Sequence, residues 1–291
     1  MKNQTKRLLI IGCGDVGMRV LKLLAPQLRV FALTSDPSRL PLLRASGATP
    51  LLGNLDHPRT LARLAGLADW VLHLAPPQGE GKADLRTRNL LSALALRSVP
   101  SRLVYVSTTG VYGDCAGASF DETRAVAPAT ERAQRRVDAE WHLRRFGSRH
   151  ACHVTLLRAP GIYALDRAGG DPTERVRAGT PLLRREDDVY TNRVHADDLA
   201  RACVAALMRG LPQRTVHVCD DSQMLMGDYF DRVADLAHLP RAPRISRVEA
   251  EARLSATRLS FLSESRRLVN ERMKRELRLT LHYPSVDAAF A

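Results

Sequence analysis

The fold is indicated by an apolar run that leads into a glycine-rich turn, Arg7-Leu8-Leu9-Ile10-Ile11-Gly12-Cys13-Gly14-Asp15-Val16-Gly17. The run is typical of a buried strand, and residues 18–24 have the amphipathic pattern of a helix. In this strand–turn–helix unit the glycines permit a tight turn, a close approach of the backbone to a pyrophosphate, and close helix–strand packing. The helix N-terminus adds unpaired N–H groups and a partial positive charge. The stretch predicts a dinucleotide site, the alternative being an ordinary glycine-rich turn; its expected binding residues are Gly12, Gly14, Asp15, Val16 and Gly17.

Strand-like and helix-like segments alternate through the first half of the chain. Strands are expected at residues 7–11, 29–33, 49–53, 69–75, 101–107 and 154–158, with helices at 18–24, 89–96, 130–146 and 199–208. This alternation predicts an α/β fold with a Rossmann-type, doubly wound parallel sheet. It breaks after Gly161, and the charged C-terminal third predicts a small, mostly helical lobe.

These patterns predict two structural units. Residues 1–165 form the dinucleotide-binding domain, to which 189–220 return. Residues 166–188 and 221–291 form a lobe on the substrate side.

Composition narrows the class of protein. The chain has 291 residues and a net charge of +13. Its arginines are dispersed and only 5% of residues are aromatic, which argues against nucleic-acid binding. The five cysteines have no C-x-x-C spacing, so we expect neither a metal site nor a disulfide framework. No segment has the roughly 20 apolar residues of a membrane span. The scattered cysteines suit a reducing cytoplasm, so we expect a cytoplasmic protein with no membrane partner. The apolar run at residues 8–11 is too short for a signal peptide, which favours a strand there.

The end of the second expected strand indicates which cofactor is bound. An NAD site favours a carboxylate there to bind the ribose 2′-hydroxyl, but this chain has Thr34 and Ser35. Asp36, just before Pro37, is better suited to cap a helix. With Arg39 nearby, the small hydroxyl side chains favour a 2′-phosphate. The sequence therefore predicts NADP, with NAD as the alternative.

Four segments, in order, resemble the extended short-chain dehydrogenase/reductase family of nucleotide-sugar epimerases and dehydratases. They are the glycine turn and the segments starting at Ser107 (S-T-T-G-V-Y-G), Leu157 (L-R-A-P-G-I-Y) and Val194 (V-H-A-D-D-L-A). The resemblance covers nearly the whole chain. It implies that further cofactor contacts come from the pairs Asn54-Leu55 and Ala75-Pro76.

The chain departs from the family at the catalytic positions. The family uses a Ser or Thr and a Tyr-x-x-x-Lys pair, with a Glu often following four residues later. Aligning the V-Y-G motif places the hydroxyl on Thr108, and aligning Glu140 places the Tyr position at Arg132 and the Lys position at Arg136. The chain thus resembles the atypical, catalytically degenerate members of the family.

Arginine cannot replace the tyrosine as a proton donor and acceptor, because it stays protonated at working pH. It can bind an anion through its planar fork, so Arg132 and Arg136, one helical turn apart, form either an anion clamp or an exposed charged face. Other candidates for proton transfer are Tyr112, Tyr163, Tyr190 and His195. Each also has a structural alternative.

Asp197, Asp198 and Arg193 can each be given a structural or a functional role. Asp197 and Asp198 are more typical of the start of a helix than of an acid–base pair. Arg193 is either a surface residue or a contact for a substrate phosphate.

The resemblance implies an NAD(P)-binding protein with nucleotide-sugar epimerase, dehydratase or reductase chemistry. Its substrate would be a small anionic molecule, in some cases nucleotide-linked. The alternative is a non-catalytic NADP-binding sensor or interaction module. A homodimer is compatible with the sequence.

Overall fold

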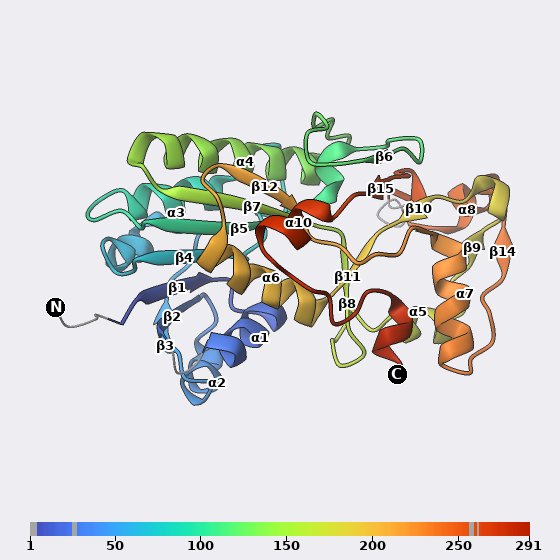
Figure 1. Ribbon diagram of the computed structural model, residues 1–291, viewed down its shortest axis with the longest axis horizontal. Coiled ribbons are helices and arrows are strands. Elements are labelled where there is room, and N and C mark those ends of the chain that lie inside the picture. The colour runs from blue at the N-terminus through green and yellow to red at the C-terminus, as the bar shows by residue number, and fades with distance from the viewer. Residues whose placement is uncertain (1–4, 25–27, 256–258, 261) are drawn as a thin grey trace.

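The computed structural model describes residues 5–24, 28–255, 259–260 and 262–291 (Figure 1). Seven parallel strands form the main sheet in the order β12-β7-β5-β4-β1-β2-β3. They are β1 (Arg7–Ile11), β2 (Arg29–Thr34), β3 (Thr49–Leu52), β4 (Trp70–His73), β5 (Arg102–Thr108), β7 (His153–Ala159) and β12 (Arg214–His217).

Helices cover both faces of this sheet (Figure 1). Alternate residues of a strand point to opposite faces, so Leu8 and Ile10 enter one core while Leu9 and Ile11 enter the other. The first core contains α1 (Asp15–Leu24), α2 (Leu40–Ala45) and α6 (Ala196–Arg209). The second contains η2 (Pro58–Leu64), α3 (Leu85–Leu94) and α4 (Glu131–His150). The predicted Rossmann-type sheet is confirmed.

A third apolar core lies in the lobe beyond β7, where Tyr229, Phe230 and Val233 pack with Leu182 and Ile245. The short strands outside the main sheet pair two by two: β8 with β11, β9 with β14, β10 with β13, and β6 with β15. The strands are β6 (Ser119–Phe120), β8 (Gly161–Tyr163), β9 (Leu182–Leu183), β10 (Tyr190–Thr191), β11 (Arg193–His195), β13 (Met224–Leu225), β14 (Arg244–Ile245) and β15 (Arg267–Leu268). The remaining helices are α5 (Pro172–Arg177), α7 (Met226–Leu236), α8 (Arg247–Arg253) and α10 (Glu271–Glu276). The 3₁₀ turn η1 (Pro37–Arg39) follows β2 and η3 (Thr109–Tyr112) follows β5, whereas η4 (Arg185–Asp187) and η5 (Val286–Ala289) come later in the chain.

The C-terminal third is not confined to this lobe. Met273 of α10, with Leu277 and Leu279, packs in the first core of the main sheet. Strand β15 runs parallel to β6, and the Arg267 backbone N–H donates to the Ala118 carbonyl oxygen. The last part of the chain therefore lies against both units.

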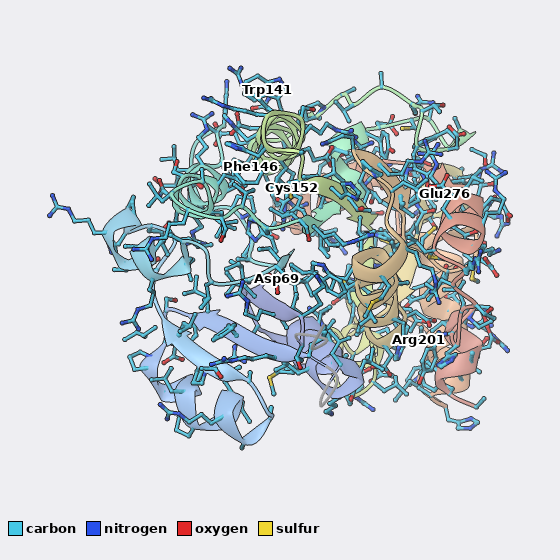
Figure 2. The ribbon with its side chains drawn as sticks, turned by 60° about the vertical axis from the view of Figure 1, so that its left-hand side comes forward. Asp69, Trp141, Phe146, Cys152, Arg201 and Glu276 are labelled. Atoms are coloured by element: carbon cyan, nitrogen blue, oxygen red, sulfur yellow. The ribbon has the colours of Figure 1, made fainter. Side chains whose placement is uncertain are left out.

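The buried face of α4 differs from the expected one. The sequence suggests an apolar stripe at Ala133, Val137 and Trp141, but Trp141 is 52% exposed. Figure 2 shows Trp141 on the outer side of the helix and Phe146 toward the sheet, where it packs with Leu143. The stripe fails because residues spaced by four drift around a helix of 3.6 residues per turn.

Several helix starts follow the sequence closely. The Asp36 carboxylate accepts hydrogen bonds from the Ser38 backbone N–H (2.9 Å) and hydroxyl (2.7 Å), so it caps η1. Asp197 and Asp198 lie in the first turn of α6, as expected of acids near a helix N-terminus.

All five cysteines are buried and unpaired. Within the described ranges, no helix is long and apolar enough to cross a membrane.

Candidate functional site

Each glycine of the first turn has a distinct structural reason. Gly12 has φ +80°, and a Cβ added there would lie 2.5 Å from the Ala75 backbone nitrogen. A Cβ on Gly17 would lie 3.1 Å from Cys13 Sγ, so the residue allows α1 to pack closely on the turn. A Cβ on Gly14 would meet no atom within 4 Å. Gly14 is therefore not needed for packing within the chain, and its open side suits a ligand that approaches the backbone.

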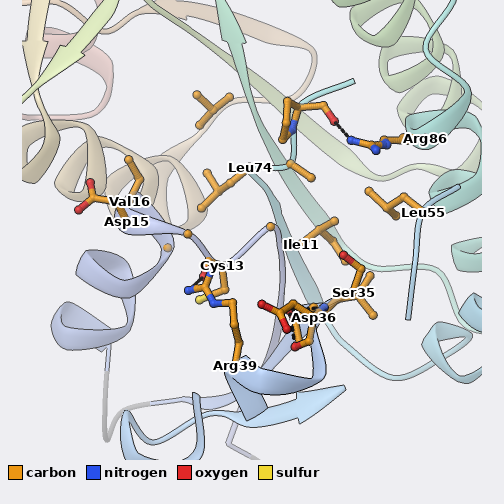
Figure 3. Close-up of a pocket in the computed structure, with 18 of the residues that line it drawn as sticks. Ile11, Cys13, Asp15, Val16, Ser35, Asp36, Arg39, Leu55, Leu74 and Arg86 are labelled. Atoms are coloured by element: carbon orange, nitrogen blue, oxygen red, sulfur yellow. Dashed lines mark hydrogen bonds between the residues drawn. The ribbon is translucent and has the colours of Figure 1, made fainter. Parts of the chain in front are cut away.

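A cavity of about 680 Å³ opens at this turn, at the carboxyl ends of β1, β2, β3 and β4 (Figure 3). Open α/β sheets bind ligands at this edge, where the strand order reverses between β1 and β4. We call it the nucleotide pocket. It brings together all the predicted cofactor residues: Gly12, Gly14, Asp15, Val16, Gly17, Thr34, Ser35, Arg39, Asn54, Leu55, Ala75 and Pro76.

The carboxyl ends of β2 and β3 form one wall of the nucleotide pocket. Arg39 donates from Nη2 to the Cys13 carbonyl oxygen at 2.8 Å, which leaves its other N–H groups for a ligand. Figure 3 shows its guanidinium beside Cys13, with Asp36 nearby. The hydrogen bonds from Ser38 lower the pKa of Asp36, so this carboxylate stays ionised but is directed to the start of η1.

Two ion pairs at this pocket escaped the sequence reasoning. Arg86 of α3 binds Asp56 through two hydrogen bonds of 2.7 Å and donates to the Pro76 carbonyl oxygen, which fastens α3 to the loops after β3 and β4. Arg167, from the loop after β8, donates to Asp15 Oδ2 at 3.2 Å. No local pattern signals these pairs, because each joins segments far apart in sequence.

A second cavity, of about 670 Å³, lies between the sheet and the lobe. We call it the lobe pocket. It shares Pro76 and Ile162 with the nucleotide pocket, so the two are adjacent. Two acidic residues line it, Asp171 and Glu264. Six arginines line it as well: Arg132, Arg135, Arg136, Arg175, Arg193 and Arg266.

Thr108 lies at the end of β5 and lines the lobe pocket. Its Oγ1 accepts a hydrogen bond from the Gly110 backbone N–H at 3.2 Å and caps η3. Because a hydroxyl both donates and accepts, this contact leaves the hydroxyl hydrogen available to a bound molecule.

The two arginines at the family's tyrosine and lysine positions differ in their contacts. Arg136 donates from Nη1 to the Tyr105 hydroxyl (2.8 Å) and to the Val106 carbonyl oxygen (3.0 Å), so that nitrogen is committed to the sheet. Arg132 is exposed where it lines the lobe pocket. Neighbouring Arg135 is buried and bonds the Gly81 carbonyl oxygen. The face is therefore neither a symmetric clamp nor a uniformly solvated surface.

The other candidate acids divide between the pocket and the core. Tyr163 and Tyr190 line the lobe pocket, and so does Tyr229, which the sequence reasoning did not consider. The Tyr229 hydroxyl is buried with no hydrogen-bond partner among the described residues, and burial raises its pKa. Arg193 lies over the Tyr229 ring, 4.7 Å from its centroid. Arg193 is thus part of the pocket wall.

Tyr112 and Glu140 belong to a buried polar network. Arg158 donates to both Glu140 oxygens (3.0 and 2.6 Å) and to the Tyr112 hydroxyl (2.7 Å). The Tyr112 oxygen also lies 2.6 Å from His217 Nε2. Burial raises the pKa of Tyr112 to about 12 and lowers that of His217 to about 4. The network ties β7 to α4 and β12 and does not reach either pocket.

His195 caps α6 by accepting a hydrogen bond from the Asp197 backbone N–H at 3.2 Å. Its ring stacks on Tyr283 with centroids 3.5 Å apart, and burial lowers its pKa. Asp198 is fully buried and accepts from the backbone N–H groups of His282 and Tyr283. These residues join α6 to the C-terminal segment, which is a structural role.

This chain is similar to known proteins in both sequence and fold. Residues 12–209 match the model of a family described as NAD(P)H-binding. A structure described as a functionally unknown conserved protein from Silicibacter pomeroyi is 28% identical, with a TM-score of 0.79 over 98% of this chain and 97% of that chain. No curated protein matches the sequence.

Two enzymes of nucleotide sugars share the fold. The dTDP-glucose 4,6-dehydratase DesIV from Streptomyces venezuelae, as a double mutant with NAD bound, is 19% identical, with a TM-score of 0.77 over 97% of this chain and 94% of that chain. UDP-glucose 4-epimerase from Thermotoga maritima, with UDP-glucose, is 17% identical, with a TM-score of 0.78 over 98% and 96%. The resemblance drawn from the motifs is confirmed: the chain belongs to the NAD(P)H-binding family and has the fold of the extended short-chain dehydrogenases/reductases.

Proposed function

We propose that the protein binds NADP in the nucleotide pocket and acts on a small anionic molecule in the lobe pocket, with chemistry related to that of nucleotide-sugar epimerases, dehydratases and reductases. The observation that carries this proposal is the adjacency of the two cavities, one lined by the glycine turn and the other by Thr108 and the arginines. When bound, the nicotinamide would supply reversible hydride transfer.

The residues present fit a dinucleotide. The open side of Gly14 and the N-terminus of α1 would receive the pyrophosphate. Asn54 and Leu55 would contact the adenine, and Ala75 and Pro76 the nicotinamide ribose.

The preference for NADP rests on charge at the end of β2. Ser35 is exposed in the pocket, and the nearby Asp36 carboxylate is held by Ser38. Among the described residues, Arg39 donates one hydrogen bond, to the Cys13 carbonyl oxygen. A 2′-phosphate would gain charge-assisted hydrogen bonds from Arg39, whereas a 2′-hydroxyl would gain weaker ones.

The anionic substrate class rests on the charge of the lobe pocket. Its six arginines outnumber Asp171 and Glu264, and Arg175 and Arg193 lie over the aromatic rings of Phe230 and Tyr229. Cations held against apolar walls attract an anion more strongly than cations in water do. A phosphate or carboxylate, free or part of a nucleotide-linked molecule, suits this environment.

A second candidate function is an NADP-binding sensor without turnover. The commitment of Arg136 Nη1 to Tyr105 and Val106 favours it, because no titrating group stands at the family's tyrosine and lysine positions. General acid–base catalysis contributes about 10²–10⁴-fold, so the loss of the tyrosine leaves a slow enzyme or none.

Calorimetry of NADP and NAD with the purified protein tests the cofactor assignment. We expect NADP to bind more tightly, and Arg39→Ala to weaken NADP by about tenfold to a hundredfold while changing NAD little. Arg63→Ala, on η2 away from the nucleotide pocket, is the matched control. Equal losses for both nucleotides would remove Arg39 from the 2′-phosphate site. A substrate screen that follows nicotinamide absorbance then separates the enzyme from the sensor.

A further inference from the structure

A carboxylate from the C-terminal part of the chain lies beside Thr108 in the lobe pocket. A Cβ added to Gly110 would lie 3.6 Å from Thr108 Oγ1 and 4.0 Å from Glu264 Oε2, so both oxygens border the same small space. The Glu264 side chain is only 9% exposed. No motif of the family points to Glu264, because it comes from the lobe.

Several contacts fix Glu264 in this place. Arg266 pairs with Glu264 Oε2 at 2.7 Å and donates to the Gly113 carbonyl oxygen at 2.6 Å, which ties the segment to the turn after β5. Between them, Ser265 donates its backbone N–H to Asp114 at 2.8 Å and accepts from the backbone N–H groups of Cys115 and Gly117. The carboxylate is therefore held by a rigid loop junction.

Two arginines interact with the Glu264 carboxylate. Arg266 pairs with it directly, and Arg132, at the family's tyrosine position, lies close enough to interact with it electrostatically. A carboxylate and two arginines thus lie together at the lobe pocket. Of these groups, the arginines only donate hydrogen bonds and the carboxylate only accepts them.

We propose that Glu264 accepts the hydrogen bond of a hydroxyl group on the small molecule bound in the lobe pocket, and that this contact makes the pocket select an alcohol over the matching ketone. The inference rests on the proposed anionic substrate class and extends it to an anion that also carries a hydroxyl. Thr108 borders the same space and orients that hydroxyl. A ketone oxygen placed there has no hydrogen to donate to Glu264, so it would lie against a negatively charged acceptor and lose the hydrogen bond that an alcohol makes.

The test uses two pairs of probes that differ at one alcohol or ketone carbon: lactate with pyruvate, and glycerol 3-phosphate with dihydroxyacetone phosphate. Their affinities for the full chain, with NADP present, are measured by calorimetry or by ligand-observed NMR. We expect each alcohol to bind at least about tenfold more tightly than its ketone. In Glu264→Gln this ratio should fall by about tenfold, because a neutral amide oxygen is a weaker acceptor than a carboxylate.

Two further variants separate a hydroxyl contact from a structural role. Glu264→Asp keeps the charge but withdraws it by one methylene, so we expect a partial loss of the alcohol preference. Glu251→Gln, an exposed residue of α8, should leave the preference unchanged. All variants should retain NADP affinity, which reports that the fold is intact.

The outcomes distinguish this inference from the function on which it rests. If alcohols and ketones bind equally, or if Glu264→Gln and Glu264→Asp both keep the preference, the inference is wrong and the anionic pocket stands. If NADP binds but none of the four probes does, the anionic substrate class fails and the inference fails with it.

Discussion

Gly12 and Gly14 are two residues apart, yet the structure predicts opposite effects of the same substitution. Gly12→Ala must adopt φ +80° and place its Cβ 2.5 Å from the Ala75 nitrogen and 2.6 Å from the Ala75 Cα. The left-handed backbone costs roughly 1–2 kcal/mol and the overpacking roughly 1–3 kcal/mol. We therefore expect Gly12→Ala to lower the free energy of unfolding by about 2–5 kcal/mol.

Gly14→Ala introduces its Cβ into open space, with no atom within 4 Å. We expect Gly14→Ala to lower the free energy of unfolding by no more than about 0.5 kcal/mol. A rise of about 0.4–1 kcal/mol is also consistent with this structure, because alanine restricts the unfolded chain. The same methyl group would stand where the pyrophosphate approaches the backbone. Losing charge-assisted hydrogen bonds there should weaken NADP by about tenfold to a hundredfold.

Urea denaturation, followed by circular dichroism without nucleotide, measures the stability of both variants, and calorimetry measures NADP binding. Gly79→Ala is a control, because a Cβ there also meets no atom within 4 Å and the residue is outside the nucleotide pocket. Two results would refute the reasoning. One is equal stability of Gly12→Ala and Gly14→Ala, and the other is wild-type NADP affinity in Gly14→Ala.

Three further predictions test the lobe and the buried polar groups. Arg132→Glu should weaken lobe-pocket anions by about tenfold to a hundredfold without affecting NADP; calorimetry showing no change would place Arg132 outside the site. Glu140→Gln leaves the buried Arg158 uncompensated, so urea titration should show a loss of about 3 kcal/mol, and no loss would contradict the network. Burial raises the pKa of Asp220 to about 7, so the folded protein binds this proton more tightly than the unfolded chain does. The stability that the protonated carboxyl contributes to the protein is therefore lost as the pH rises from about 4 to 7. Asp220→Asn should therefore gain about 2 kcal/mol relative to wild type between pH 5 and pH 8, and a pH-independent difference would exclude this titration.

Local sequence patterns are enough to predict the Rossmann sheet and its glycine turn. Residues 8–11 of β1 form an unbroken apolar run, and the glycine spacing of the turn that follows is itself a local pattern. The contact that requires Gly12, with the backbone of Ala75, is not local. The cofactor residues could also be proposed from sequence, because the carboxyl ends of parallel strands necessarily meet at one edge of the sheet. The caps at Asp36 and at the start of α6 follow from the same local rules.

Which side chains face the lobe pocket depends on how distant segments pack, and the sequence did not predict it. The sequence placed Arg132 and Arg136 on one helical face, but the hydroxyl of Tyr105, on β5, engages Arg136. The exposed position of Trp141 depends on how α4 is rotated against the sheet, which its own pattern leaves open. Glu264 lies beside Thr108 because its neighbours Ser265 and Arg266 form hydrogen bonds with residues 113–117, which follow β5 and η3 in the chain. Contacts between distant segments depend on how the whole chain packs, so no local pattern encodes them.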